Sequence, residues 1–417
     1  MSVNVEAEPQ PRNPNERALT QVDKRVAIDA LRAVAAVLVM AGHLRALLFV
    51  DFIEVEAKSL AAKLFYFATS LGHQSVVLFF ALSGFLVGGS ALATLREGRW
   101  SGRHYAIARI SRIHTVLVPA LALTALVDSG CRALLVPACA PPFALHGASL
   151  VLPPVATRDG LVVAVGNLLG LHGIATSTFG TNSPLWSLSN ELLYYTAFGI
   201  LLAATNATRR PSAPLLALAL ALAAFAWLPA GYFSGFLIWL AGAAVPWIAT
   251  RLRAARWTAQ APLATLAGAA ALFLVAVVAT KVGGIAAHLG DAGLDYTVGA
   301  VAVALLAAIE ALPTPPQTRS SATGLWAGLA ALSFSLYAMH FPFAVLAQDQ
   351  VLGCEGPRFQ PRLDTLARYG LGFAALLVIG WLFARAFEDR TPRVRALLTR
   401  VTGSRFKGSV DERPRAT

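Results

Sequence analysis

The 417-residue chain is 56% hydrophobic and only 13% of its residues are charged, about half the charged share of a typical soluble domain. A soluble protein of this composition would lack the polar residues that must cover its surface, so the sequence indicates a protein whose outer face meets lipid. The net charge of +12 does not indicate nucleic-acid binding, because the Lys and Arg residues fall between apolar segments, where they set membrane topology.

Apolar segments of roughly 20 residues, the length that crosses a bilayer, recur along the chain. The sequence predicts about ten spans, at 26–50, 74–95, 105–128, 184–205, 213–230, 231–250, 262–281, 294–312, 324–349 and 368–388. A shorter apolar segment, 161–171, is interrupted by Gly and Asn and is predicted to be interfacial or re-entrant. This pattern predicts an all-α fold, a polytopic membrane bundle.

Polar segments flank the predicted spans. Residues 1–24 lack the apolar core of a signal peptide and are predicted to be a disordered cytosolic tail. Residues 25–390 form the predicted transmembrane domain, and 391–417 form a basic cytosolic tail. If the N-terminus is cytosolic, about three times as many Lys and Arg residues lie in cytosolic segments as in outside loops, which is the positive-inside bias. An even number of spans then also places the C-terminus in the cytosol.

The longest predicted outside segment, 129–183, contains Cys131 and Cys139. Outside the cytosol a disulfide between them is expected to persist, although two unpaired small side chains fit the sequence equally well. These cysteines and Cys354 show no metal-ligand spacing. We therefore expect no metal site.

The first span carries four ionisable residues, Asp29, Arg32, His43 and Arg45. Each such residue near the bilayer centre costs about 2.5–3.5 kcal/mol on insertion scales, so a simple anchor would not contain four. Arg32 and His43 are predicted to share one helix face, about 20° from perfect alignment and about 16 Å apart along the axis. The alternative is that Asp29 and Arg32 only pair with each other while His43 contributes to packing.

The second and third spans hold further polar residues. Ser83-Gly84 predicts close helix packing, and without a GxSxG elbow Ser83 is not assigned as a nucleophile. At the start of the third span, Arg109 and Arg112 are i,i+3 neighbours. Such a pair suits phosphate binding, although ordinary positive-inside arginines show the same spacing.

In the fourth span, Glu191 lies about two turns inside an apolar helix. A buried carboxylate needs a partner, for which Asp29, His43 and a substrate hydroxyl are the candidates. Trp186 and Tyr194 fit two roles equally, interface aromatics or a platform for a sugar ring. In the ninth span, His340 lies just before a proline that predicts a kink, and a lone buried His is more often structural than catalytic.

Five short patterns recur in a known order. They are Arg32-x10-His43, Phe79-Phe80-x-x-Ser83-Gly84-Phe85, Arg109-x-x-Arg112, Trp186-x-Leu188-x-x-Glu191 and Ser333-Phe334 to His340-Phe341-Pro342. With this ordered set, the chain resembles the acyltransferase-3 family of integral membrane acyltransferases over roughly residues 25–390. That family modifies surface polysaccharides, lipopolysaccharide, Nod factors and some antibiotics. Phe334 stands where the family usually has Tyr, and His114-Thr115 where Pro often follows the second Arg. Neither departure removes a proposed catalytic group.

The resemblance implies a cytosolic acyl-CoA donor, with acetyl as the expected acyl group and succinyl or longer chains as alternatives. The implied acceptor is a hydroxyl of an extracytoplasmic or lipid-linked glycan, reached from the bacterial inner membrane. We expect the donor phosphates and the upper pantetheine at Arg32, Arg109 and Arg112. His43 is expected to be the general base or the acyl carrier.

Positioning and substrate-binding roles follow for the remaining candidates. Asp29 is expected to fix Arg32, and Glu191 to orient His43 or the acceptor hydroxyl. Substrate contacts are expected from Trp186, Tyr194, Ser83 and His340. A transporter or a structural membrane protein is the competing class, and only the enzyme would consume acyl-CoA.

Overall fold

The structure is a computed structural model. It describes residues 23–131, 134, 158–208, 213–255, 261–281, 283–312, 321–353 and 356–403. Throughout these ranges the regular elements are helices and none is a strand, so the predicted all-α fold is confirmed.

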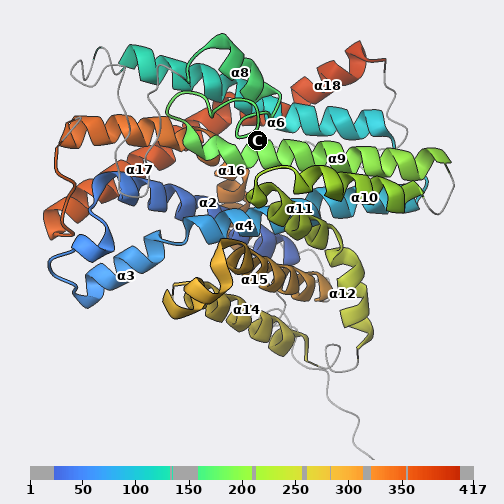
Figure 1. The fold of residues 1–417 in the computed structure, drawn as a ribbon, viewed down its shortest axis with the longest axis horizontal. Helices are drawn as coiled ribbons and strands as arrows, with labels where there is room; N and C mark the ends of the chain where they lie inside the picture. The colour runs from blue at the N-terminus through green and yellow to red at the C-terminus, as the bar shows by residue number, and fades with distance from the viewer. Residues whose placement is uncertain are drawn as a thin grey trace, which may run out of the picture.

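Long helices make up most of the molecule (Figure 1). In chain order they are α2 (Lys24–Leu48), α3 (Leu60–Thr69), α4 (Gly72–Ser83), the π-helical segment η2 (Gly84–Gly89), α5 (Ser90–Arg96), α6 (Gly102–Ala125), α8 (Leu161–Leu168), α9 (Trp186–Thr208), α10 (Ala213–Ala226), α11 (Ala230–Ala243), α12 (Val245–Ala254), α14 (Pro262–Ala279), α15 (Gly283–Ala311), α16 (Ser321–Leu352), α17 (Leu363–Ala386) and α18 (Thr391–Val401). Each of the predicted spans overlaps one or more of these helices.

The number of spans differs from the prediction. Among the described residues, seven helical stretches are long and apolar enough to cross a membrane, or eight if the pair Gly231–Ala243 and Val245–Ala254, bent by 45°, is one span. Ten spans are therefore not confirmed. The apolar part of α10, Leu215–Ala226, is too short, since at about 1.5 Å per residue it covers well under the ~30 Å hydrocarbon core. The cytosolic placement of both termini remains a prediction.

Helices α2 and α16 lie side by side and run in the same direction. Arg32 of α2 meets Ser333 of α16, and further along His43 meets His340. This order confirms that Arg32 and His43 share a helix face. Fully buried apolar side chains, among them Met40 and Phe341, fill the contact between the two helices.

The close packing predicted at Ser83-Gly84 is confirmed between α4 and α11. A Cβ atom added at Gly84 would collide with the backbone carbonyl of Trp239, and one at Gly242 would collide with that of Ala81. Two glycines therefore let the backbones approach each other directly. The helix continues through η2, and such π-helical segments are frequent near functional sites.

Two predicted peripheral segments have defined structure in part. The apolar stretch around 161–171 includes the short helix α8, which exposes Leu161 and Val162. Residues 391–401 of the predicted C-terminal tail form α18, which packs on α6. Cys139, Cys354 and the side chain of Cys131 lie outside the described residues, as does any disulfide between them.

Candidate active site

Two histidines from distant parts of the chain meet inside the bundle. The Nδ1 atom of His43 lies 2.8 Å from the Nε2 atom of His340. Their rings stack with centroids 5.1 Å apart and 5° between planes, and Phe341 closes one side with its ring edge-on to His43 at 5.2 Å. His340 is fully buried and His43 partly buried.

Hydrogen bonding fixes the direction of this contact when both rings are neutral. The Nδ1 atom of His340 lies 2.9 Å from the carbonyl oxygen of Leu336 and 3.0 Å from that of Tyr337. Carbonyl oxygens only accept, so Nδ1 of His340 carries the hydrogen and its Nε2 offers a lone pair. His43 then donates from Nδ1 to His340 and keeps a lone pair on its own Nε2. A base with a fixed tautomer results.

The α16 segment that carries His340 is itself held from α9 and the loop before it. The Tyr337 hydroxyl donates to the carbonyl of Pro184 at 2.8 Å and lies 2.5 Å from Ser187 Oγ. Pro342 has no N–H, so the carbonyl of Ala338 has no helical donor. Asn182 Nδ2 donates to it instead at 2.8 Å.

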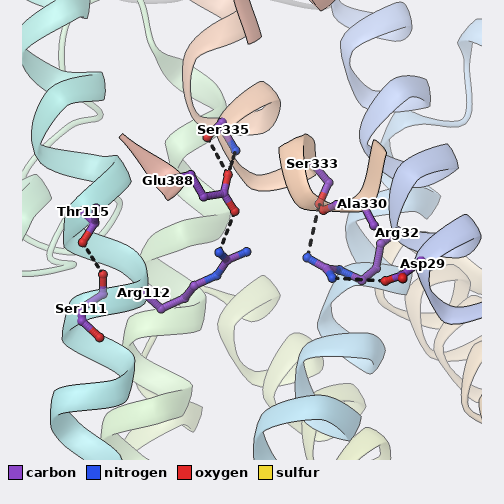
Figure 2. A network of polar contacts seen from close by, with 9 residues as sticks. All are labelled: Asp29, Arg32, Ser111, Arg112, Thr115, Ala330, Ser333, Ser335 and Glu388. Carbon is purple, nitrogen blue, oxygen red and sulfur yellow. Dashed lines mark hydrogen bonds and ion pairs between the residues drawn. The ribbon is translucent and has the colours of Figure 1, made fainter. Parts of the chain in front are cut away.

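A second polar cluster lies closer to the start of α2. We call it the inner layer, and its members are Asp29, Arg32, Arg109, Arg112, Glu191, Ser333, Ser335 and Glu388. There Arg32 from α2 and Arg112 from α6 extend toward each other across the space between their helices (Figure 2). Arg32 Nη1 lies 3.7 Å from Asp29 Oδ1, the pairing expected from the sequence, and Arg32 Nη2 contacts Ser333 Oγ at 3.5 Å. Arg112 Nη1 lies 2.6 Å from Glu388 Oε1.

Sequence reasoning missed Glu388 and Ser335, and it quoted Ser333 only within a motif, without a role. The Glu388 side chain is buried, and its Oε2 accepts from Ser335 N at 3.1 Å and from Ser335 Oγ at 2.6 Å. The available signal was a pair of acids, Glu388 and Asp389, directly after the last apolar span, in a segment otherwise rich in arginine.

Arg109 and Glu191 also belong to the inner layer. The Arg109 guanidinium lies over the ring of Tyr195, 5.8 Å from its centroid, so Arg109 and Arg112 have different partners and do not act as one fork. The Glu191 carboxyl lies beside the hydroxyls of Ser83 and Tyr195, within electrostatic range of both arginines. Ser83 Oγ lies 2.9 Å from the Tyr195 hydroxyl.

This arrangement changes the role expected for Glu191. The side chain hydrogen-bonded to His43 is that of His340, while Glu191 is engaged by Ser83 and Tyr195. A sequence argument had no means of choosing between the two partners, because the choice depends on how α2, α9 and α16 pack. His340 is therefore the side chain placed to orient His43, and the expectation that Glu191 orients the acceptor hydroxyl stays a prediction.

The two aromatic candidates on α9 differ in environment. Tyr194 is fully buried, donates to the carbonyl of Tyr232 at 3.1 Å and packs against Phe80 and Phe236. Both its ring and its hydroxyl are thus occupied by protein. Trp186 begins α9 and is 38% exposed, so of the two it is the one with surface available to a substrate.

Comparison with known protein families identifies the chain. The sequence model of a family described as an acyltransferase domain matches residues 25–395, which is nearly the whole chain. Neither a curated protein nor a solved structure matches significantly. The matched region contains both histidines and the inner layer. The chain belongs to the acyltransferase-3 family and is a membrane acyltransferase with several apolar helices.

Proposed function

We propose that the protein transfers an acyl group, with acetyl as the expected group, from cytosolic acyl-CoA to a hydroxyl of an extracytoplasmic or lipid-linked glycan in the bacterial inner membrane. The observation that supports this most is the placement of Arg32 and His43 on the α16-facing side of α2. Their separation along the helix, about 16 Å, is comparable to an extended pantetheine arm. Phosphates held at the inner layer would therefore present the thioester at His43.

The donor end of this proposal relies on the arginines. Asp29 and Glu388 each contact one edge of an arginine, and the guanidinium groups of Arg32 and Arg112 point toward each other (Figure 2). Guanidinium groups bind phosphate oxygens through paired charge-assisted hydrogen bonds. Two of them arriving from different helices suit a group with several anionic oxygens.

The chemistry at the other end uses the lone pair on His43 Nε2. As the acceptor oxygen attacks the thioester carbonyl, Nε2 takes the hydroxyl proton. The carbon–sulfur bond then breaks, and the leaving thiolate receives that proton to give free CoA and the acyl ester. His340 accepts the Nδ1–H bond throughout, which keeps Nε2 aimed at the substrate and supports the imidazolium. A general base of this kind contributes about 10²–10⁴-fold.

A covalent route uses the same lone pair. His43 Nε2 would attack the thioester itself, release CoA and pass the acyl group to the acceptor in a second step. The two routes differ in one observable, because only the covalent route releases a stoichiometric burst of CoA before acceptor is added.

The test is release of CoA from acetyl-CoA by the purified protein, with a panel of sugar acceptors. The wild type is expected to release CoA faster when its acceptor is present, and His43→Ala is expected to lose that activity. His73→Ala is the matched control, since His73 pairs with Asp295 at 2.6 Å and not with either histidine of the pair. Equal activity of His43→Ala and wild type contradicts the role of His43, whereas no CoA release with any acceptor contradicts the acyl-CoA donor.

A further inference from the structure

Glu388 joins three parts of the bundle that are distant in sequence. It lies in the short helix η7 (Glu388–Arg390) that follows α17. One carboxylate oxygen contacts Arg112 of α6 at 2.6 Å, and the other accepts from both the backbone N–H and the hydroxyl of Ser335 on α16. A single carboxylate just after the end of α17 thus connects the middle of α6 with the middle of α16.

The two side chains of the Glu388–Arg112 pair differ in burial, which indicates which of them is fixed. The Glu388 side chain is 5% exposed, whereas that of Arg112 is 34% exposed. Two bonds from Ser335 anchor the carboxylate to the helix that also carries His340. Arginine has a long side chain with many rotamers, so it is the Arg112 guanidinium whose position is set by the contact.

The direction in which Arg112 is held matters for the proposed donor site. Glu388 engages Nη1, and the guanidinium group points toward Arg32 (Figure 2). Arg112 and Arg32 are close enough to interact electrostatically. Two cations facing each other repel and would separate without opposing charges behind them. Asp29 supplies that charge for Arg32, and Glu388 supplies it for Arg112.

We propose that Glu388 is a positioning residue, which holds Arg112 facing Arg32 so that the phosphates of acyl-CoA meet both guanidinium groups. The inference rests on the proposed function. An acid beside Arg112 could act in two ways. A carboxylate that competes with the donor for Arg112 weakens phosphate binding, whereas a carboxylate that orients Arg112 strengthens it.

The experiment compares two donors, acetyl-CoA and S-acetylpantetheine, which lacks the phosphates. Glu388→Gln removes the charge, and Glu388→Asp keeps the charge but shortens the side chain, so that it no longer reaches both Arg112 and Ser335. Both variants are expected to raise the KM for acetyl-CoA at least tenfold with less than a threefold change in kcat. Their KM for S-acetylpantetheine is expected to stay within twofold of wild type. Asp389→Asn is the control, since the neighbouring Asp389 is exposed and pairs with Arg385.

Three results would overturn the inference. A lower KM for acetyl-CoA in Glu388→Gln identifies a competing carboxylate. Equal weakening with both donors identifies a general structural role. An unchanged KM in both variants shows that Arg112 needs no partner. If the wild type itself does not prefer acetyl-CoA over S-acetylpantetheine, the proposed donor site fails independently of Glu388.

A variant that retains the carboxylate guards against loss of folding. Ser335→Ala removes one of the two bonds that anchor Glu388 and leaves the Arg112 pair intact. If the Glu388 variants do not yield folded protein, Ser335→Ala is expected to raise the KM for acetyl-CoA several-fold and to leave that for S-acetylpantetheine unchanged. No change for either donor would overturn the inference.

Discussion

His340 offers a test of how His43 is made ready to act as a base. The Nδ1–H group of His43 donates to Nε2 of His340 over 2.8 Å, and the two carbonyls behind His340 fix the acceptor. Replacing His340 with Gln places an amide oxygen near the position of Nε2. Replacing it with Asn gives a side chain of the same chemistry that is too short to reach His43. The two variants therefore differ only in whether the hydrogen bond can form.

The size of the effect follows from the burial of the pair. Leaving a buried donor without an acceptor costs about 1–3 kcal/mol, and each 1.36 kcal/mol is worth tenfold in rate. When this free energy is lost from the reactive orientation of the His43 ring, His340→Asn is expected to lower kcat by about 5- to 150-fold. His340→Gln is expected to retain most of the activity, within about fivefold of wild type.

The assay is the steady-state rate of CoA release at saturating acetyl-CoA and acceptor, with thermal unfolding in detergent as a check on folding. The KM for acetyl-CoA is expected to stay unchanged, because the inner layer is built from other residues. Equal activity of His340→Asn and His340→Gln would refute the positioning of His43 by His340. A loss confined to KM would also refute it, since it would place His340 in donor binding.

Two further predictions concern stability. Gly84→Ala is expected to lower the free energy of unfolding by about 1–3 kcal/mol through overpacking, because its Cβ would collide with the Trp239 backbone. Gly268→Ala on α14 is the control, since its Cβ meets nothing within 4 Å, and it is expected to be neutral or stabilising. Similar unfolding temperatures for the two variants would contradict the close packing at Gly84. Burial lowers the pKa of His172, which lies in the loop before α9, to about 4 even though its Nε2 donates to the Leu185 carbonyl. The unfolded pKa is about 6.5, so the stability due to neutral His172 is present above pH 6.5 and is lost as the pH falls toward 4, by about 3 kcal/mol in total. His172→Gln should therefore flatten the pH dependence of the unfolding temperature between pH 7 and 5, and an unchanged slope would contradict the assignment.

What could be predicted from the sequence was mainly what depends on helical periodicity. Arg32 and His43 are eleven residues apart, which nearly completes three turns, and the structure places both against α16. The Asp29–Arg32 pair follows from i,i+3 spacing in the same way. Helix existence was also predictable, because long apolar runs separated by polar residues leave few alternatives in lipid.

Features that depend on the packing of distant helices were not predictable. His43 and His340 are 297 positions apart, and nothing in either helix alone specifies the other as partner. Arg109 and Arg112 illustrate the same limit within one helix. Their spacing makes them neighbours on one helix face. Arg109 nevertheless contacts Tyr195 of α9, whereas Arg112 contacts Glu388 of η7. Ten spans are not confirmed among the described residues because the apolar part of α10 is too short, and because α9, although 23 residues long, is not among the helices apolar enough to cross a membrane.

The most direct test of the account is the sidedness of the reaction. The protein would be reconstituted in sealed vesicles, with the orientation determined by protease access to a tag at the N-terminus. Donor binding at the inner layer predicts that membrane-impermeant acetyl-CoA supports transfer only from the side where α2 begins, and that the acylated acceptor accumulates on the opposite side. Equal use of acetyl-CoA from either side, or product formed only on the side of the donor, would contradict the placement of phosphates at Arg32 and Arg112 and of the thioester at His43.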